Sequence, residues 1–204
     1  MENFLSLPGD KQKSIRDAAL KVFGENSYKK SSVKDIADEA DISKSMVFHY
    51  FGTKKDLYLY LVHYCSKVLT GPLTSIQKDL PRDYFERMKV ATEKQMGVLK
   101  EEPFFLKFLT TMLSESDPEI SEELQTYREY AASFQSSYAL DDIDFSKFKD
   151  DVDLKVVLRM MVWMAEGFSR NVSLESEDTL DKYIDQFKES VELLRKNLYK
   201  EEYL

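Results

Sequence analysis

Apolar side chains recur along this chain at intervals of three and four residues, the spacing that lines one face of an α-helix. The first such stripe comprises Ile15, Ala19, Val22 and Phe23. Runs of β-branched residues at alternate positions do not occur, and neither do the Asn-Gly and Asp-Gly pairs typical of β-hairpins. The pattern therefore predicts an all-α protein of about nine helices.

The prolines divide this pattern, and we expect each to lie beside a helix end, because proline lacks the backbone N–H that a helix interior needs. They are Pro8, Pro72, Pro81, Pro103 and Pro118. Beyond the N-terminal region, the expected helices cover residues 53–71, 82–101, 104–115, 119–138, 154–173 and 178–200. The segment 139–153, rich in Asp and Lys, is expected to be the least regular region, with residues 142–153 as a solvated acidic loop.

Residues 31–57 contain three helix starts in close succession. Ser32, Ser43 and Thr53 can each cap a helix, and the first and third have an acidic residue three positions on, as in a capping box. Two short helices joined by a turn of three or four residues form a helix-turn-helix, whose second helix enters the major groove of DNA. The second helix here, residues 44–50, is the candidate for reading DNA.

This region resembles the N-terminal domain of the tetracycline-repressor (TetR) family over residues 11–60. The matching residues are Phe23, Ile36-Ala37, Ile42-Ser43-Lys44, Phe48-His49-Tyr50-Phe51, Lys54 and Leu57. The chain departs from the family pattern at Ser27, Asp41 and Ser45, where the family often has glycine. It also departs at Met46, where the family favours a small hydroxyl residue, and at Phe48, where the family frequently has tyrosine. The resemblance implies a three-helix DNA-binding head at 1–52 and a larger helical ligand-binding and dimerisation domain at 53–204, connected by the helix at 53–71.

The resemblance also assigns DNA contacts on a pseudo-palindromic double-stranded operator. Base edges would be approached by Lys34, Lys44, Ser45 and His49, and phosphates would be held by Ser32, Ser43, Tyr50 and Lys54. Met46 lies on the same helix and belongs to the same candidate surface.

The last two expected helices each carry an apolar seam with a period of 3.5 residues, as in a helical bundle between two chains. TetR-like proteins dimerise through these helices, so we expect a homodimer through Val157, Met161, Met164, Phe168, Ile184, Phe187, Val191, Leu194 and Leu198. The alternative is that both seams face the core of their own domain.

Aromatic and methionine side chains are frequent in the middle of the second domain. They could line an apolar pocket with a few polar groups, or they could simply fill the core. The pocket interpretation predicts a hydrophobic or aromatic effector held by Phe104, Phe105, Phe108, Met112, Tyr127, Tyr130, Phe134, Met160, Trp163 and Met164. Glu166 could offer a carboxylate to a cationic compound.

The net charge of −8 is unevenly divided. Residues 1–67 have 11 Lys and Arg against 9 Asp and Glu, while the remainder have 18 against 28. A basic head on an acidic body suits a protein that presents only its head to DNA. A single cysteine, no signal-like start and no long apolar run indicate a cytoplasmic protein without a membrane span.

Other chemistry is poorly supported. Residues 142–153 have several calcium-loop acids but lack the glycine at the sixth position. No nucleophile triad or phosphate-binding loop is apparent, so we expect neither an enzyme nor a cofactor. The sequence favours a ligand-responsive transcriptional regulator, most simply a repressor released by its effector. A transcriptional activator of the same fold and a helical protein–protein adaptor are the alternatives.

Overall fold

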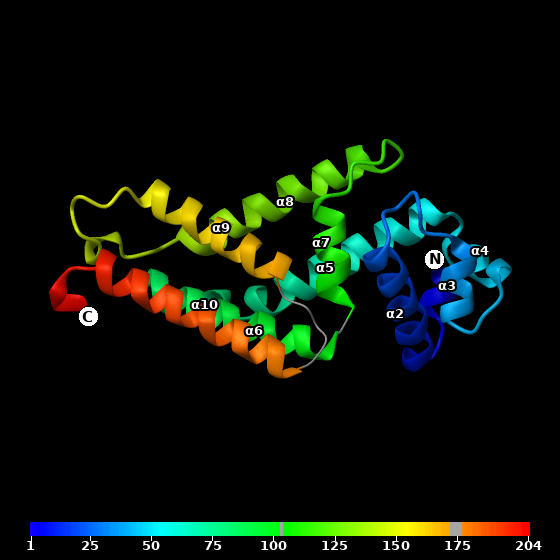
Figure 1. Ribbon diagram of the computed structural model, residues 1–204, viewed down its shortest axis with the longest axis horizontal. Helices are drawn as coiled ribbons and strands as arrows, with labels where there is room; N and C mark the ends of the chain where they lie inside the picture. The colour runs from blue at the N-terminus through cyan, green and yellow to red at the C-terminus, as the bar shows by residue number, and fades with distance from the viewer. Residues whose placement is uncertain (103, 172–176) are drawn as a thin grey trace. The chain divides into compact units, whose positions relative to one another are not determined.

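The computed structural model describes residues 1–102, 104–171 and 177–204 (Figure 1). The prediction of an all-α fold is confirmed, because the described residues form helices and no strand. The helices are α1 (Glu2–Leu5), α2 (Gly9–Glu25), α3 (Val33–Glu39), α4 (Lys44–Phe51), α5 (Lys54–Ser75), α6 (Tyr84–Glu101), α7 (Phe105–Leu113), α8 (Ser121–Leu140), α9 (Leu154–Asn171) and α10 (Glu177–Leu198). Short 3-10 helices cover Gln77–Asp79, Phe145–Lys147 and Glu201–Tyr203.

Two of these helices differ from the sequence expectation. The four-residue helix α1 was not predicted. Pro72 was expected beside a helix end, and this was wrong, because α5 continues past it to Ser75. Pro72 lies in the last turn, where its missing N–H removes only one hydrogen bond of the helix. Pro103 falls outside the described residues. None of the described helices is long and apolar enough to cross a membrane.

The chain folds into two compact units. The first comprises residues 1–70 and 101–132, and the second comprises residues 71–100 and 133–204. Helices α5 and α8 therefore each run from one unit into the other. The expected domain limits, 1–52 and 53–204, follow from the extent of the helix-turn-helix motif rather than from compactness, and they stay a prediction.

In the first unit, α7 packs directly on α2. A Cβ atom at Gly24 would lie 2.9 Å from the backbone nitrogen of Phe108, so only glycine permits this approach. The Thr111 hydroxyl donates to the Gly24 carbonyl oxygen at 2.8 Å. Beside this contact, the ring of Tyr58 meets Phe23 and Phe108 with centroid distances of 4.9 and 5.3 Å. The three-helix head and α7 thus share one aromatic core.

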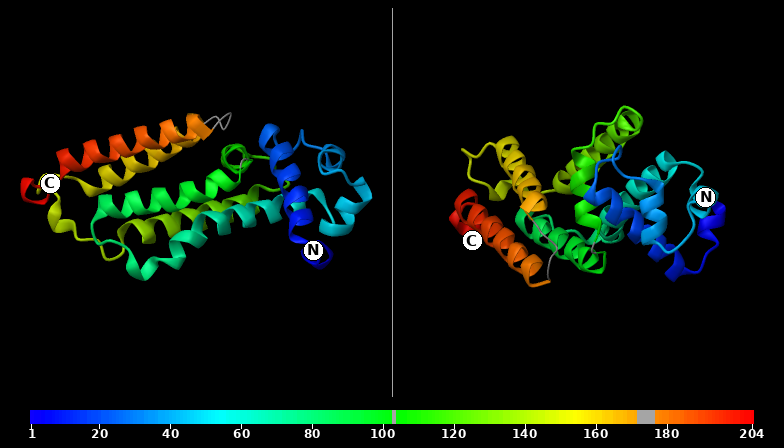
Figure 2. Two further views of the ribbon diagram at one scale, coloured as in Figure 1. Left: turned by 90° about the horizontal axis from the view of Figure 1, so that it is seen from below. Right: turned by 45° about the vertical axis from the view of Figure 1, so that its right-hand side comes forward.

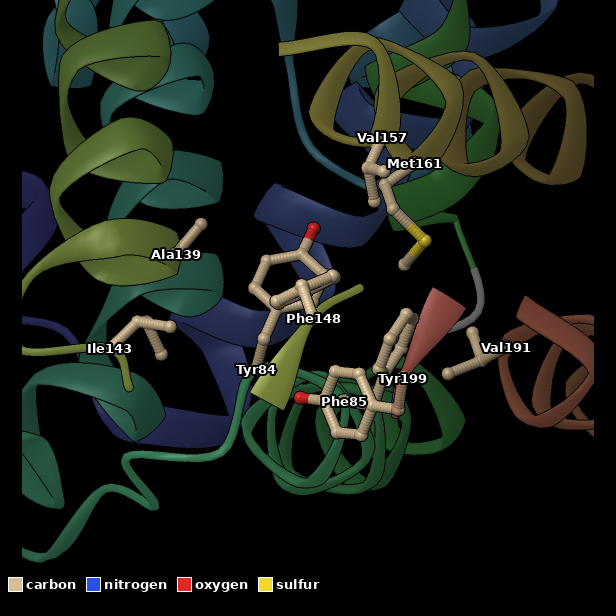
Figure 3. Close-up of a cluster of buried hydrophobic side chains, with 9 residues drawn as sticks. All are labelled: Tyr84, Phe85, Ala139, Ile143, Phe148, Val157, Met161, Val191 and Tyr199. Carbon is tan, nitrogen blue, oxygen red and sulfur yellow. The ribbon is translucent and has the colours of Figure 1, made fainter. Parts of the chain in front are cut away.

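The core of the second unit lies between α6, α8, α9 and α10 (Figure 3). Its buried residues are Tyr84, Phe85, Ala139, Ile143, Phe148, Val157, Met161, Val191 and Tyr199. Helices α9 and α10 run side by side in opposite directions, as the sequence predicted (Figure 2).

The segment 139–153 is less solvated than expected. Ile143 and Phe148 are buried in the core of the second unit. Its backbone is also tied to the C-terminal residues, since Lys149 N donates to Leu198 O and Lys200 N to Lys147 O, both at 2.9 Å. The expectation of a solvated acidic loop was therefore wrong for Ile143 and Phe148, two large apolar side chains that burial favours.

Candidate DNA-binding surface and associated sites

The helix pair α3–α4 forms around the predicted caps. Ser32 Oγ accepts from the Asp35 amide at 3.1 Å, and Ser43 Oγ accepts from the Met46 amide at 3.3 Å. Between the helices, Asp41 has φ 51°, a left-handed conformation that aspartate tolerates better than most residues. The turn that the family often builds with glycine is therefore formed here by Asp41.

The outward face of this pair carries most of the expected DNA contacts. Those exposed to solvent are Lys34, Ser43, Lys44, Ser45 and His49, while Ser32 and Met46 are half-buried. Phe48, which sequence reasoning did not assign to the site, is 42% exposed, and the Lys44 ammonium lies 5.8 Å from its ring centroid. A spacing of four residues from Lys44 on one helix face was the signal that could have identified Phe48.

Two expected phosphate contacts are placed differently. Tyr50 is only 6% exposed and its ring packs against Phe4, with centroids 6.2 Å apart. The Lys54 ammonium donates to the carbonyl oxygens of Tyr28 and Ser31, at 3.0 and 3.3 Å. Lys54 thus holds the loop before α3, and its ammonium also lies 4.1 Å from the centroid of the Tyr28 ring. Tyr50 follows Val47 by three residues, the spacing of an inward helix face.

Ion pairs reduce the positive charge available on the head. Lys21 pairs with Glu39 at 2.7 Å, and this hydrogen bond raises the pKa of the Lys21 ammonium. Lys55 pairs with Glu123 at 2.6 Å, with the same effect on its pKa. In the part of the chain that the structure describes, Lys44 has no ion pair within 4.0 Å. Its charge is therefore free to meet DNA.

The expected dimer seam lies mostly inside its own unit. Val157, Met161 and Val191 belong to the core cluster in Figure 3, and Ile184 is also buried. The half-buried members of the seam pack against the same cluster: Met164, Phe187, Leu194 and Leu198. The side chain of Phe168 falls outside the described residues. The assignment of these residues to a dimer contact stays a prediction, although the buried ones already pack within their own protomer.

A second apolar stripe on α9 points away from that core. Val156, Met160 and Trp163 are spaced by four and three residues and are 38, 38 and 61% exposed. Gly167 continues the stripe, and a Cβ atom added there would meet no described atom within 4 Å. This outward stripe was missed because its period equals that of the buried seam.

The residues expected to line a ligand pocket divide between the two units. Phe105, Phe108 and Met112 are buried in the first unit, whereas Met160 and Trp163 are exposed in the second. The others are half-buried or, for Tyr130, exposed: Phe104, Tyr127, Tyr130, Phe134 and Met164. Two surface grooves, of about 490 and 420 Å³, are lined by other residues. The Glu166 side chain falls outside the described residues.

Comparison with known proteins agrees with the geometry of the head. A family model described as bacterial regulatory proteins, tetR family, matches residues 15–61. The uncharacterized HTH-type transcriptional regulator YuxN of Bacillus subtilis is 34% identical over 119 residues, which are 57% of this chain and 38% of YuxN. The match therefore spans well under two thirds of that relative.

Two further similarities extend over most of the chain. The HTH-type transcriptional repressor AcnR of Corynebacterium diphtheriae is 22% identical over 188 residues, 89% of this chain and 91% of AcnR. The crystal structure of the transcriptional regulator FadR from Bacillus subtilis in complex with stearoyl-CoA has a TM-score of 0.62 and 17% identity, and covers 90% of this chain and 96% of FadR. At that identity the structural likeness shows the fold alone. Motif, relatives and fold agree that residues 15–61 form a helix-turn-helix head of the tetR family of bacterial regulatory proteins.

Proposed function

We propose that this protein is a homodimeric repressor whose operator binding is released by a hydrophobic or aromatic effector. The observation that carries the proposal is the exposed face of α4, which is capped at Ser43 and presents Lys44, Ser45 and His49 to solvent. Such a helix, second in a helix-turn-helix, inserts into the major groove. AcnR, named as a repressor, is similar over almost the whole chain, which supports repression over activation.

The roles within the head follow from exposure and chemistry. Lys34, Lys44, Ser45 and His49 are available for base edges, where donors from lysine meet guanine O6 and N7. Ser32, Ser43 and the half-buried Met46 are assigned to phosphate contacts, with backbone donors added where α5 begins after Thr53. Tyr50 and Lys54 mainly hold the head together.

We assign the dimer contact to the outward stripe of α9. Val156, Met160 and Trp163 form an exposed apolar stripe on one helix face, and exposed apolar patches can mark contact sites. Glycine within a helix costs about 1 kcal/mol relative to alanine. At Gly167 no described atom within the protomer requires this, which suits the close approach of a second helix. A two-fold symmetric dimer presents two heads, one for each half-site of a pseudo-palindromic operator.

The effector class rests on the apolar character of the half-buried candidates Phe104, Tyr127, Phe134 and Met164. FadR of the same fold was solved with stearoyl-CoA, a ligand with a long apolar chain, which supports this class. The buried Phe105, Phe108 and Met112 are core residues in this proposal rather than pocket walls.

The proposal is tested by selecting duplexes from a random-sequence DNA pool with the wild-type protein. A pseudo-palindromic consensus is expected, and the logarithm of the binding constant should fall with the logarithm of salt concentration by about 0.9 per phosphate contacted. A helical adaptor without DNA readout would enrich no sequence. That outcome would contradict the proposed function as a sequence-specific DNA-binding repressor.

The effector is sought by screening apolar and aromatic compounds for a rise in melting temperature. A compound present at a hundred times its dissociation constant stabilises the protein by about 2.7 kcal/mol. The same compound is expected to release the selected duplex, because coupling between two binding sites is reciprocal. If compounds raise the melting temperature and none of them weakens DNA binding, regulation by an apolar effector is excluded for this protein.

The Lys44→Ala variant tests the reading helix. It should lose discrimination at one base pair of the selected duplex, by about 1–3 kcal/mol, if Lys44 makes a well-oriented base contact. Fluorescence anisotropy with single-base variants of the duplex measures this. Lys11→Ala, in the first turn of α2, is the control and should leave base preference unchanged. A uniform loss of affinity over all variants would make Lys44 a phosphate contact instead.

A further inference from the structure

The N-terminal segment, residues 1–7, lies against the reading helix α4 (Figure 1). Phe4 is fully buried, and its ring centroid lies 4.7 Å from that of Phe51, 5.2 Å from Tyr60 and 6.2 Å from Tyr50. Two of these rings belong to α4 and one to α5. Burying an aromatic side chain among three others is strongly favourable, so Phe4 anchors the segment on α4.

The other end of the segment is fixed to α2. Gln12 Nε2 donates to the carbonyl oxygens of Leu5 and Leu7, at 3.1 and 2.8 Å. The Ser6 hydroxyl donates to the carbonyl oxygen of Asn3 at 2.9 Å. With both ends held, residue 3 has little backbone freedom left to lose when its side chain makes a contact.

That contact is made with a residue of the DNA-reading face. Asn3 Nδ2 lies 3.1 Å from His49 Nε2. An amide N–H only donates, so Nε2 accepts, and a neutral imidazole then carries its proton on Nδ1. His49 remains exposed, and its donor-bearing edge is the one not occupied by Asn3.

We propose that Asn3 is a positioning residue for base readout, which fixes the ring and tautomer of His49 so that Nδ1–H is offered to an acceptor on DNA. The proposal rests on the proposed function and deepens it. Purine N7, guanine O6 and thymine O4 are the acceptors that the major groove presents. A ring held in one tautomer favours these edges over the amino donors of adenine and cytosine.

The first measurement is made without DNA. The chain has two histidines, so long-range nitrogen–proton NMR spectra resolve His49 beside His63, an exposed internal reference. We expect the Nδ1–H tautomer at His49 in the wild type and a shift toward the pattern of His63 in Asn3→Ala. An unchanged His49 spectrum in the variant overturns the proposal.

The second measurement is a double-mutant cycle on the duplex selected by the wild-type protein. Asn3→Ala is expected to weaken discrimination roughly 2- to 10-fold, the range of one net hydrogen bond, at the same base pair as His49→Ala. The double variant should bind like His49→Ala alone, because Asn3 acts through His49. Glu2→Ala, an exposed neighbour on α1, should retain wild-type discrimination.

Additive effects of the two substitutions, or an effect of Asn3→Ala at every base pair, would show that Asn3 only stabilises the head, and would overturn the proposal. If the wild-type protein selects no duplex, the proposed function fails instead. The NMR measurement then still decides whether Asn3 fixes the tautomer of His49.

Discussion

Replacing both Met160 and Trp163 with glutamate is expected to convert the dimer to a folded monomer. Because the proposed contact is two-fold symmetric, each substitution appears twice, and four carboxylates would face one another across the apolar stripe of α9. Like charges at an interface cost several kcal/mol, and each 1.4 kcal/mol is tenfold in affinity. The dissociation constant should therefore rise about a thousandfold or more, as measured by analytical ultracentrifugation.

Two controls separate this result from general damage. Leu113→Glu introduces the same charge at an exposed apolar residue of α7 and should leave the dimer intact. Val191→Glu places it in the core of the second unit, where we expect loss of helical circular dichroism rather than a folded monomer. A folded, monomeric Val191→Glu variant together with a dimeric Met160→Glu/Trp163→Glu variant would restore the seam first expected from the sequence.

Substitution of Glu115 by alanine is expected to destabilise the first unit by about 2–4 kcal/mol. The buried carboxylate accepts from the backbone N–H groups of Tyr28, Ser116 and Asp117 at 2.6, 2.8 and 2.9 Å. Removing it leaves three donors without this partner, and a buried donor left unsatisfied costs about 1–3 kcal/mol. The sum is reduced because water can reach the exposed Ser116. Urea unfolding measures the loss.

Glu122→Ala, an exposed acidic residue at the start of α8, is the matched control and should change the free energy of unfolding by less than about 0.5 kcal/mol. Glu115→Gln keeps one acceptor oxygen and should lie between the two. Equal stability of Glu115→Ala and Glu122→Ala would contradict the structural role of the buried carboxylate.

The sequence by itself determined the features that depend on local chemistry. Ser32, Ser43 and Thr53 cap helices as expected, because a cap needs only a side-chain oxygen and an amide two or three residues away. The buried face of α3, with Val33, Ile36 and Ala37, likewise follows from helical spacing alone. The all-helical class and the helix-turn-helix could be predicted for the same reason.

Only the tertiary structure decided which of two similar faces is buried. On α9, the stripe beginning at Val157 and the stripe beginning at Val156 have the same period, and packing against α6, α8 and α10 enclosed the first and exposed the second. A pattern within one helix contains no information on where its neighbours lie.

Contacts between distant segments were equally beyond the sequence. Lys54 meets Tyr28 and Ser31 across more than twenty residues, and Asn3 meets His49 across 46. Lys54 was expected to contact DNA, and Asn3 had no assigned role. Folding brings each of them within hydrogen-bond distance of a partner far away in the sequence. The spacing of residues along a helix determines which of them lie on the same face. Packing between distant segments determines what that face contacts.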